Sequence, residues 1–262
     1  MKAQLHLDKR KIRRSFAAAA GRYDDFASLQ RKVGMALLEM FPPEPSTGST
    51  LDIGCGTGFF TRELARRNNG HLLAMDIAMP MLEFCRQKNA AFSVDYLCAD
   101  AEKLPFAAHG FEWIYSNLAF QWCQDLSAVF ADCKRILAMG GQLAFATFGP
   151  ATLRELKTAW AAVDAYPHVN EFYGVDAIVG FLRQAGFSSI CRETVLYQSR
   201  YESVQSLMHE LKAIGAHNVI LERNRKPTTR RQLQRMIESY PLGNIGEEVL
   251  ASYEIIFIRA RV

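Results

Sequence analysis

The sequence lacks the long apolar runs and the paired cysteines that mark membrane proteins and many metal-binding or secreted proteins. No apolar run approaches the about 18 residues that a helix needs to cross a bilayer. The 6 cysteines form no Cys-x-x-Cys pair and no histidine cluster accompanies them, which argues against a metal site and a disulfide framework. The basic N-terminal stretch precedes only a short apolar segment, too short for a signal-peptide core. These absences predict a cytoplasmic protein with reduced thiols and no membrane partner.

The sequence also lacks internal repeats, low-complexity segments and a strong charge imbalance. Its 262 residues are 49% hydrophobic and 22% charged, which are ordinary values for a globular protein. The net charge of +4 permits an acidic partner without requiring one. We therefore expect one domain over residues 1–262, with an insertion if the chain exceeds what the core fold needs.

Strand-like segments alternate with helical segments through the first two thirds of the chain. Strands are predicted at 50–53, 71–76, 93–98, 111–116 and 142–148, with a turn at Gly140-Gly141 before the last of these. Helices are predicted at 59–67, 80–88 and 126–137. This alternation predicts an α/β fold with parallel strands and right-handed crossovers, and with helices on both faces of the sheet.

The two ends of the chain depart from this alternation. Residues 1–45 form an N-terminal helical segment, with a helix predicted over 11–40 and ended by prolines. In the last third, helices are predicted at 153–163 and 176–185, and strands at 190–201 and 253–258. Residues 202–248, between the last two strands, show helical patterns broken by Gly and Pro. We interpret them as a helical insertion that covers the strand ends, as a lid or a partner-binding element.

The most informative motif is Leu-Asp-Ile-Gly-Cys-Gly-Thr-Gly at residues 51–58. Here a predicted strand turns through alternating glycines into a predicted helix, which lets the backbone approach a ligand closely. Asp52 precedes the first glycine. A carboxylate at that point would repel a pyrophosphate but suits a cationic ligand that carries an ammonium group. S-adenosylmethionine fits this description.

Two further acids close the next two predicted strands. Asp76 is placed to accept hydrogen bonds from both ribose hydroxyls of an adenosine. Asp100, followed by Ala101, is placed to meet an adenine amino group. Each acid taken alone could instead cap a helix or a turn. Three acids at the ends of three successive strands favour S-adenosylmethionine binding over that alternative.

This constellation resembles the class I S-adenosylmethionine-dependent methyltransferases. The resemblance implies a Rossmann-like sheet of seven strands whose last strand forms an antiparallel hairpin. It also implies that Gly54, Gly56 and Gly58 approach the methionine moiety. The full set expected at the cofactor is Tyr23, Asp52, Gly54, Cys55, Gly56, Gly58, Asp76, Ile77, Met81, Asp100, Ala101 and Ser116. Many relatives have Ser two residues after the ribose acid, where this chain has Ala78.

The stretch 116–123, Ser-Asn-Leu-Ala-Phe-Gln-Trp-Cys, follows the fourth predicted strand, on the acceptor side of such folds. It lacks the Asn/Asp-Pro-Pro-Tyr type of sequence found in methyltransferases that act on amino groups of nucleic acid or protein. It also contains no His or Lys that could act as a base. Gln121 and Trp122 could line an acceptor pocket, although Trp122 could equally pack against the sheet. An ionised carboxylate, which needs positioning and no base, suits this site as the acceptor.

Three stretches, within 15–30, 153–170 and 209–218, together with 116–123, resemble the malonyl-acyl-carrier-protein O-methyltransferase family of biotin synthesis. This family methylates the free carboxylate of a malonyl thioester on acyl carrier protein, with S-adenosylmethionine as donor and no metal. The resemblance implies an acidic carrier partner and no nucleic acid. Candidates to bind the substrate are Arg22, Gln121, Trp122, Arg154 and Lys212. The basic cluster from Arg223 to Arg235 could meet the carrier or could be a solvated helix face.

Two other interpretations remain open from the sequence. The same cofactor half would serve a methyltransferase of a small free carboxylic acid or of a quinone precursor. Methyltransferase-like assembly factors of respiratory complex I also resemble residues 116–122 and 212–218, and some of these folds act as binding modules.

Overall fold

The computed structural model describes residues 6–44, 47–67, 70–216, 227–241 and 248–262. Seven strands form one sheet in the order β3-β2-β1-β4-β5-β7-β6. Their bounds are β1 Thr50–Ile53, β2 Leu72–Asp76, β3 Val94–Cys98, β4 Phe111–Asn117, β5 Leu137–Phe148, β6 Ser188–Tyr201 and β7 Val249–Arg261. The strands from β3 to β5 pair in parallel, and β7 pairs antiparallel with both β5 and β6. The predicted fold class, including the antiparallel last strand, is confirmed.

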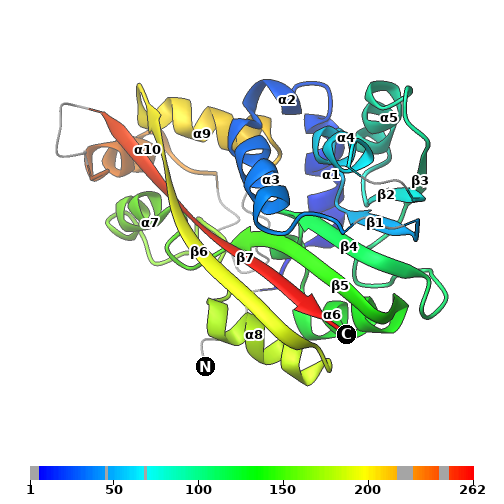
Figure 1. Cartoon of the computed structure of the whole chain (residues 1–262). Coiled ribbons are helices and arrows are strands. Elements are labelled where there is room, and N and C mark those ends of the chain that lie inside the picture. Colours follow the sequence, from blue (N-terminus) through cyan, green and yellow to red (C-terminus); the bar gives the residue numbers. More distant parts are fainter. Residues whose placement is uncertain (1–5, 45–46, 68–69, 217–226, 242–247) are drawn as a thin grey trace.

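Helices cover both faces of the sheet (Figure 1). One face carries α3 (Ser28–Met40), α4 (Phe59–Ala65) and α5 (Met79–Lys88), and the opposite face carries α6 (Leu126–Ile136) and α8 (Val175–Gln184). Successive strand residues point to opposite faces, so Tyr115 packs against α3 and α4 while Ile114 packs against α6. Because both faces are buried, the central strands are almost continuously apolar.

The described part of the connection between β6 and β7 contains the helices α9 (Val204–Ala213) and α10 (Arg230–Glu238). They lie with α7 (Arg154–Ala161) near one end of the long β6–β7 hairpin (Figure 1). Met236 of α10 and Leu207 of α9 are buried in the same core cluster as α7. The sequence places helices correctly between the last two strands.

The predicted helix over 11–40 is wrong as a single element. The structure breaks it into α1 (Lys9–Ala19), α2 (Tyr23–Phe26) and α3. The break has a packing reason, because α1 buries Ala19 and Ala20 against Ala78 and Met81 at the strand ends. The helix α3 instead packs on the main core of the sheet. One straight helix could not reach both surfaces.

The turn expected at Gly140-Gly141 is also wrong. Both glycines lie inside β5, which begins at Leu137. Gly140 has a φ of 75°, and the pairing of β5 with β4 shifts between Phe111 and Trp113. The glycine pair therefore makes an irregularity within the strand, where a glycine readily adopts a left-handed conformation.

Candidate functional site

A cavity lies at the carboxyl ends of β1 to β4, where the strand order changes direction between β1 and β4. Ligands of open α/β sheets bind at such a switch point. The cavity encloses about 730 Å³ of empty space, part of it open to solvent. Its lining comes from α1, α2 and the four strand ends: Lys9, Ile12, Phe16, Tyr23, Ile53, Gly54, Gly56, Met75, Asp76, Ile77, Met81, Ala99, Asp100, Ala101, Asn117, Leu118, Ala119, Trp122 and Cys123. We call it the first cavity.

The first cavity brings together most of the residues that the sequence assigned to a cofactor. Those that line it are Tyr23, Gly54, Gly56, Asp76, Ile77, Met81, Asp100 and Ala101. Outside the lining lie Asp52, Cys55, Gly58 and Ser116. The residues that sequence reasoning missed include Lys9, Phe16 and Asn117. Asn117 directly follows a predicted strand and belongs to the stretch 116–123, and these were the signals that could have identified it.

The three glycines of the motif have three different structural roles. A Cβ atom at Gly54 would lie 2.3 Å from the Cβ of Ala119, so Gly54 permits the close approach of the β4 loop. A Cβ at Gly58 would lie 2.4 Å from Asn89 Nδ2, so Gly58 permits packing against α5. At Gly56 the nearest atom, Cε1 of Tyr23, is 4.0 Å away. Of the three, Gly56 is the glycine whose missing side chain leaves space inside the first cavity.

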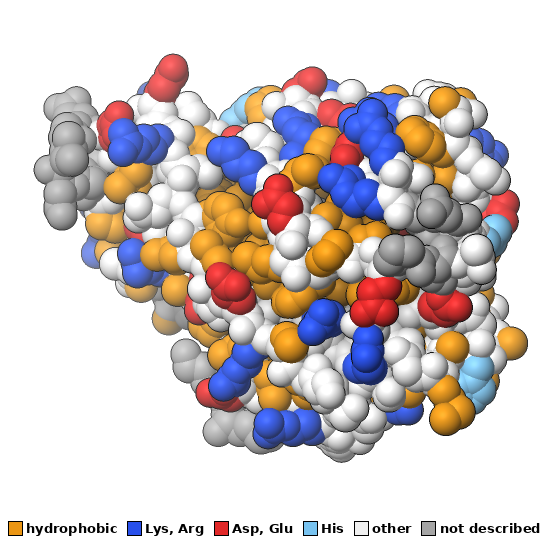
Figure 2. Space-filling view, in the orientation of Figure 1, with side chains coloured by type: hydrophobic (Ala, Val, Ile, Leu, Met, Phe, Trp, Pro, Cys, Tyr) orange, Lys and Arg blue, Asp and Glu red, His pale blue; other side chains and the backbone are white. Residues whose placement is uncertain are grey.

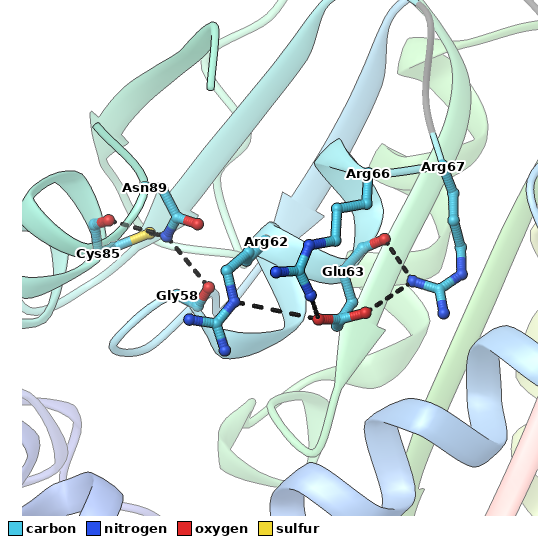
Figure 3. Close-up of polar contacts among 7 residues, drawn as sticks. All are labelled: Gly58, Arg62, Glu63, Arg66, Arg67, Cys85 and Asn89. Carbon is cyan, nitrogen blue, oxygen red and sulfur yellow. Dashed lines mark hydrogen bonds and ion pairs between the residues drawn. The ribbon is translucent and has the colours of Figure 1, made fainter. Parts of the chain in front are cut away.

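Figure 3 shows how the corner after β1 is fixed. The side chain of Asn89 donates from Nδ2 to the carbonyl oxygens of Gly58 (3.1 Å) and Cys85 (2.8 Å). On the far side of α4, Glu63 accepts from Arg66 (2.6 Å) and Arg67 (2.8 Å). The Asn89 contacts tie the start of α4 to α5 and so hold the glycine loop in place, whereas the Glu63 contacts are local to α4 and the residues that follow it.

Asp76 is the acid best placed to meet a ligand in the first cavity. It is 9% exposed, and its two oxygens accept from the backbone N–H of Gly56 (3.0 Å) and of Ala78 (2.8 Å). Burial raises the pKa of this carboxyl to about 6, although these backbone hydrogen bonds oppose the rise. A carboxylate that is held by two backbone N–H groups has acceptor capacity left for hydroxyls of a ligand.

Asp52 does not line the first cavity. It is 1% exposed, and its Oδ2 accepts from the hydroxyl of Thr61 at 2.6 Å. Its Oδ1 has no hydrogen-bond partner among the described residues. Burial raises the pKa of Asp52 to about 7, with the nearby Asp76 adding to the rise. The structure therefore shows Asp52 beneath the glycine loop, and its role toward a cationic ligand stays a prediction.

Asp100 is engaged by the N-terminal helix. Lys9 Nζ lies 2.7 Å from Asp100 Oδ2 and 2.8 Å from Glu102 Oε2. Burial lowers the pKa of Lys9, but its hydrogen bonds to both carboxylates outweigh this and raise the pKa. Asp100 also accepts from the backbone N–H of Glu102 at 3.0 Å. These contacts place α1 across the opening of the first cavity.

Aromatic side chains of α1 and α2 complete the cover of the first cavity. The ring of Phe16 meets that of Trp122 edge-on, with ring centroids 5.3 Å apart. Tyr23 is packed near the glycine loop, and burial, together with the charge of Asp76, raises the pKa of its hydroxyl. The tyrosine is therefore a neutral hydrogen-bonding group at neutral pH.

Cys55 and Ser116 act within the protein framework. Ser116 is fully buried and donates from Oγ to the carbonyl of Ile53 at 3.0 Å, which joins β4 to the end of β1. Cys55 is buried against α5, and burial raises the pKa of its thiol well above the ordinary value. A thiol in that state is a poor nucleophile.

A second cavity adjoins the first, with about 660 Å³ of empty space that is partly open to solvent. Trp122 lines both cavities. The two are also joined by a hydrogen bond, because Asn117 Nδ2 of the first donates to the carbonyl of Gln30 of the second at 2.9 Å. The remaining lining is Leu29, Phe148, Thr152, Leu153, Leu156, His168, Val169, Asn170, Phe172, Glu210, Leu211, Ile214, Ala216 and Tyr253.

Each cavity contains a leucine in the left-handed backbone region. Leu118, in the first, has a φ of 52°, and Leu153, in the second, has a φ of 55°. This conformation costs a residue with a Cβ about 1–2 kcal/mol. Such strain is commonly found at ligand sites, because the surrounding structure must hold the residue there. Its presence at both cavities supports their functional importance.

The residues expected to bind an acceptor are not gathered at either cavity, with the exception of Trp122. Arg22 and Lys212 are exposed and lie outside both linings. The Nε of Arg154 lies 3.1 Å from Glu155 Oε1, with the arginine side chain 55% exposed. Gln121 donates to the carbonyl of Leu118 at 2.6 Å, beside the first cavity. The assignment of these four residues to an acceptor stays a prediction.

Exposed apolar side chains cross the middle of the face shown in Figure 2, with Lys and Arg side chains gathered over α3 and α4. Within the described residues, no three or more His, Cys, Asp or Glu side chains are grouped so that they could hold a metal ion. No helix in the same part of the chain is long and apolar enough to span a membrane.

Comparison with known proteins agrees with this geometry. Residues 51–145 match the family described as "Methyltransferase domain". The chain is 42% identical to a Methylococcus capsulatus protein named malonyl-[acyl-carrier protein] O-methyltransferase, over 95% of this chain and 92% of that one. It is 39% identical to the biotin biosynthesis bifunctional protein BioHC of Cellvibrio japonicus, over 96% of this chain. The chain spans 50% of that bifunctional relative.

Solved structures share the fold at low sequence identity. An S-adenosylmethionine-dependent methyltransferase from Mesorhizobium loti superposes with a TM-score of 0.54 at 21% identity. The match covers 87% of this chain and 96% of that one.

Proposed function

Because the chain belongs to the malonyl-[acyl-carrier protein] O-methyltransferase family, we propose that it methylates the free carboxylate of a malonyl thioester on acyl carrier protein. The observation that carries the proposal is the 42% identity to the Methylococcus capsulatus relative over 92% of that protein's length. The product, a malonyl methyl ester, would begin the synthesis of the pimelate part of biotin.

The first cavity fits S-adenosylmethionine. Asp76 keeps free acceptor capacity for the ribose hydroxyls, and Gly56 leaves space that we assign to the methionine moiety. Asp100 lines the same cavity, and we assign it to the adenine amine. When bound, this cofactor supplies an electrophilic methyl group on a positively charged sulfur. Burial disfavours the ionised forms of Asp76 and Asp52 in the free protein, so a cation bound here would favour the charged state of both carboxyl groups.

Methyl transfer to a carboxylate requires few catalytic groups from the protein. A carboxylate is ionised at neutral pH, so no base is needed. One carboxylate oxygen forms a bond to the methyl carbon while the carbon–sulfur bond breaks, and the sulfur keeps the electron pair. The protein must align the two partners and exclude water. Trp122 lines both cavities, which supports our assignment of this residue to the place where donor and acceptor would meet.

The helix α10 is our proposed contact for the carrier protein. Arg230, Arg231 and Arg235 are exposed on it, while Met236 anchors it to the core. A positive helix surface would attract an acidic carrier. The remaining basic residues of the expected cluster, Arg223, Arg225 and Lys226, lie outside the described residues. A lid or partner-binding role for the insertion 202–248 stays part of this proposal.

The test of the reaction is a comparison of acceptors. The protein is incubated with methyl-labelled S-adenosylmethionine and with malonyl carrier protein, malonyl-CoA or free malonate at equal concentration. Label should enter the malonyl carrier fastest. Equal rates with all three would contradict the carrier proposal, and no transfer to any would contradict the reaction itself.

The test of the carrier surface is charge reversal on α10. Changing Arg230, Arg231 and Arg235 together to Glu should raise the KM for malonyl carrier about tenfold, because each exposed charge contributes less than about 1 kcal/mol. The KM for malonyl-CoA should not change. Arg183→Glu, an exposed charge on α8 at the opposite face, is the control. An equal effect of both changes would contradict a specific role of α10.

Growth rescue separates this enzyme from an assembly factor of the same fold. A strain that requires biotin because it lacks this methyltransferase should grow when the chain is expressed. Failure of rescue despite expression of folded protein would favour the assembly-factor alternative.

A further inference from the structure

We propose that the second cavity is the acceptor site and that His168 and Asn170 hold the free carboxylate of the malonyl group. The inference rests on the proposed function and refines it. It replaces the sequence-based expectation that an arginine or lysine grips this carboxylate.

The position of the second cavity suits an acceptor. It shares Trp122 with the first cavity, and Asn117 of the first is hydrogen-bonded to Gln30 of the second. A group that enters the second cavity and reaches Trp122 therefore arrives beside the proposed cofactor. Phe148, Leu156 and Phe172 give the cavity apolar walls, which suit a thioester chain and help to exclude water.

His168 is the one basic side chain in this lining, within the part of the chain that the structure describes. Its Nε2 lies 2.8 Å from Asp164 Oδ1, and its ring stacks on Trp160 with centroids 3.7 Å apart and planes 5° apart. Asp164 does not line the cavity, whereas His168 does. The hydrogen bond and the ring stacking hold the imidazole in one orientation at the cavity.

Asn170 supplies a second polar group two residues further along. It is 7% exposed, and its Oδ1 has no hydrogen-bond partner among the described residues. Buried polar groups are normally paired, so an unpaired amide in a cavity lining indicates a ligand that completes it. Rotation of the amide by half a turn exchanges its oxygen and nitrogen, which would present an N–H donor to a carboxylate.

The lining also contains the carboxylate of Glu210, which accepts a hydrogen bond from the hydroxyl of Tyr201 at 2.7 Å. This carboxylate would repel that of a malonyl group. Among the polar groups of the lining, we therefore assign the acid end of the acceptor to the imidazole of His168 and the amide of Asn170.

The inference is tested with His168→Gln and Asn170→Asp, a pair in which the second variant keeps the shape of the side chain. We measure the KM for malonyl carrier, the inhibition constant of acetyl carrier, which has no carboxylate, and the affinity for S-adenosylmethionine. The KM should rise about 10- to 100-fold in each variant, the scale for losing a hydrogen bond to a charged group. The other two constants should stay within about twofold. His71→Gln removes the imidazole of an exposed His–Asp pair outside both linings and is the matched control.

An unchanged KM in both variants would overturn the inference. The inference would also be overturned if the inhibition constant of acetyl carrier rose as much as the KM for malonyl carrier. His168 and Asn170 would then shape the cavity without binding the carboxylate. If His168→Gln lost cofactor binding through misfolding, Asn170→Asp would decide alone. Absence of turnover in the unaltered enzyme would instead contradict the proposed function, before any variant is compared.

Discussion

Replacement of Asp76 by Ala gives the sharpest test of the cofactor site. The carboxylate of Asp76 accepts from the backbone N–H groups of Gly56 and Ala78, and it lines the first cavity. Alanine removes the acceptor for both ribose hydroxyls and leaves the two backbone donors unpaired. Asp76→Ala thus weakens the ligand contacts and loosens the glycine loop that frames them.

The expected loss follows from the energy of unmet hydrogen bonds. Leaving buried polar partners unpaired costs about 1–3 kcal/mol, which corresponds to about a 5- to 150-fold higher Kd. Asp76→Asn keeps one acceptor oxygen, so its loss should fall at the lower end of this range. Asp76→Asn leaves one backbone N–H facing an amide N–H2, whereas Asp76→Ala leaves both backbone donors unpaired. Asp76→Asn should therefore lower the melting temperature of the free protein less than Asp76→Ala does.

Titration calorimetry with S-adenosylmethionine measures this effect, and circular dichroism of each variant checks the fold. Asp95→Ala is the matched control, because Asp95 lies on the neighbouring strand β3 with its side chain 69% exposed and outside the first cavity. The reasoning would be refuted by an unchanged Kd in Asp76→Ala. An equal loss in Asp95→Ala would refute it as well.

Four other predictions concern the surroundings of the site and the core of the sheet. Gly56→Leu should abolish cofactor binding with an unchanged circular dichroism spectrum, because the leucine side chain would enter the first cavity. Gly58→Leu should instead lower the melting temperature, because the leucine side chain would collide with α5. Cofactor affinity should fall up to about tenfold for each pH unit below about 6, as Asp76 gains a proton, and Asp76→Asn should lose this dependence in calorimetry. Burial raises the folded-state pKa of Asp52 to about 7. The protonated carboxyl therefore contributes to the free energy of unfolding at low pH, and this contribution is lost as the pH rises through about 7. Asp52→Asn should therefore raise the melting temperature more at pH 8 than at pH 5. Phe130→Ala, in the fully buried aromatic cluster under the sheet, should lower the free energy of unfolding by about 3–5 kcal/mol in denaturant titrations.

Local patterns in the sequence determined most of the fold. The strand Thr50–Ile53 and the helix α5 were predicted within a residue of their observed bounds, because the strand ends at a glycine motif and Pro80 marks the first turn of the helix. The parallel order followed from the alternation of strands and helices. The glycines and the acids at the strand ends were recognisable for the same reason, since each belongs to a short motif with a fixed place at a strand end.

The tertiary structure alone decided how distant segments meet. The sequence gives no local signal that Lys9 reaches Asp100, or that Asp52 is sealed beneath the glycine loop. The second cavity is assembled from residues as far apart as Leu29 and Tyr253, and its polar groups come from separate stretches whose meeting point no local pattern predicts. Such a site depends on packing between segments that are remote in the chain. Periodicity within one segment cannot report that packing, and so the acceptor side became visible only in the folded molecule.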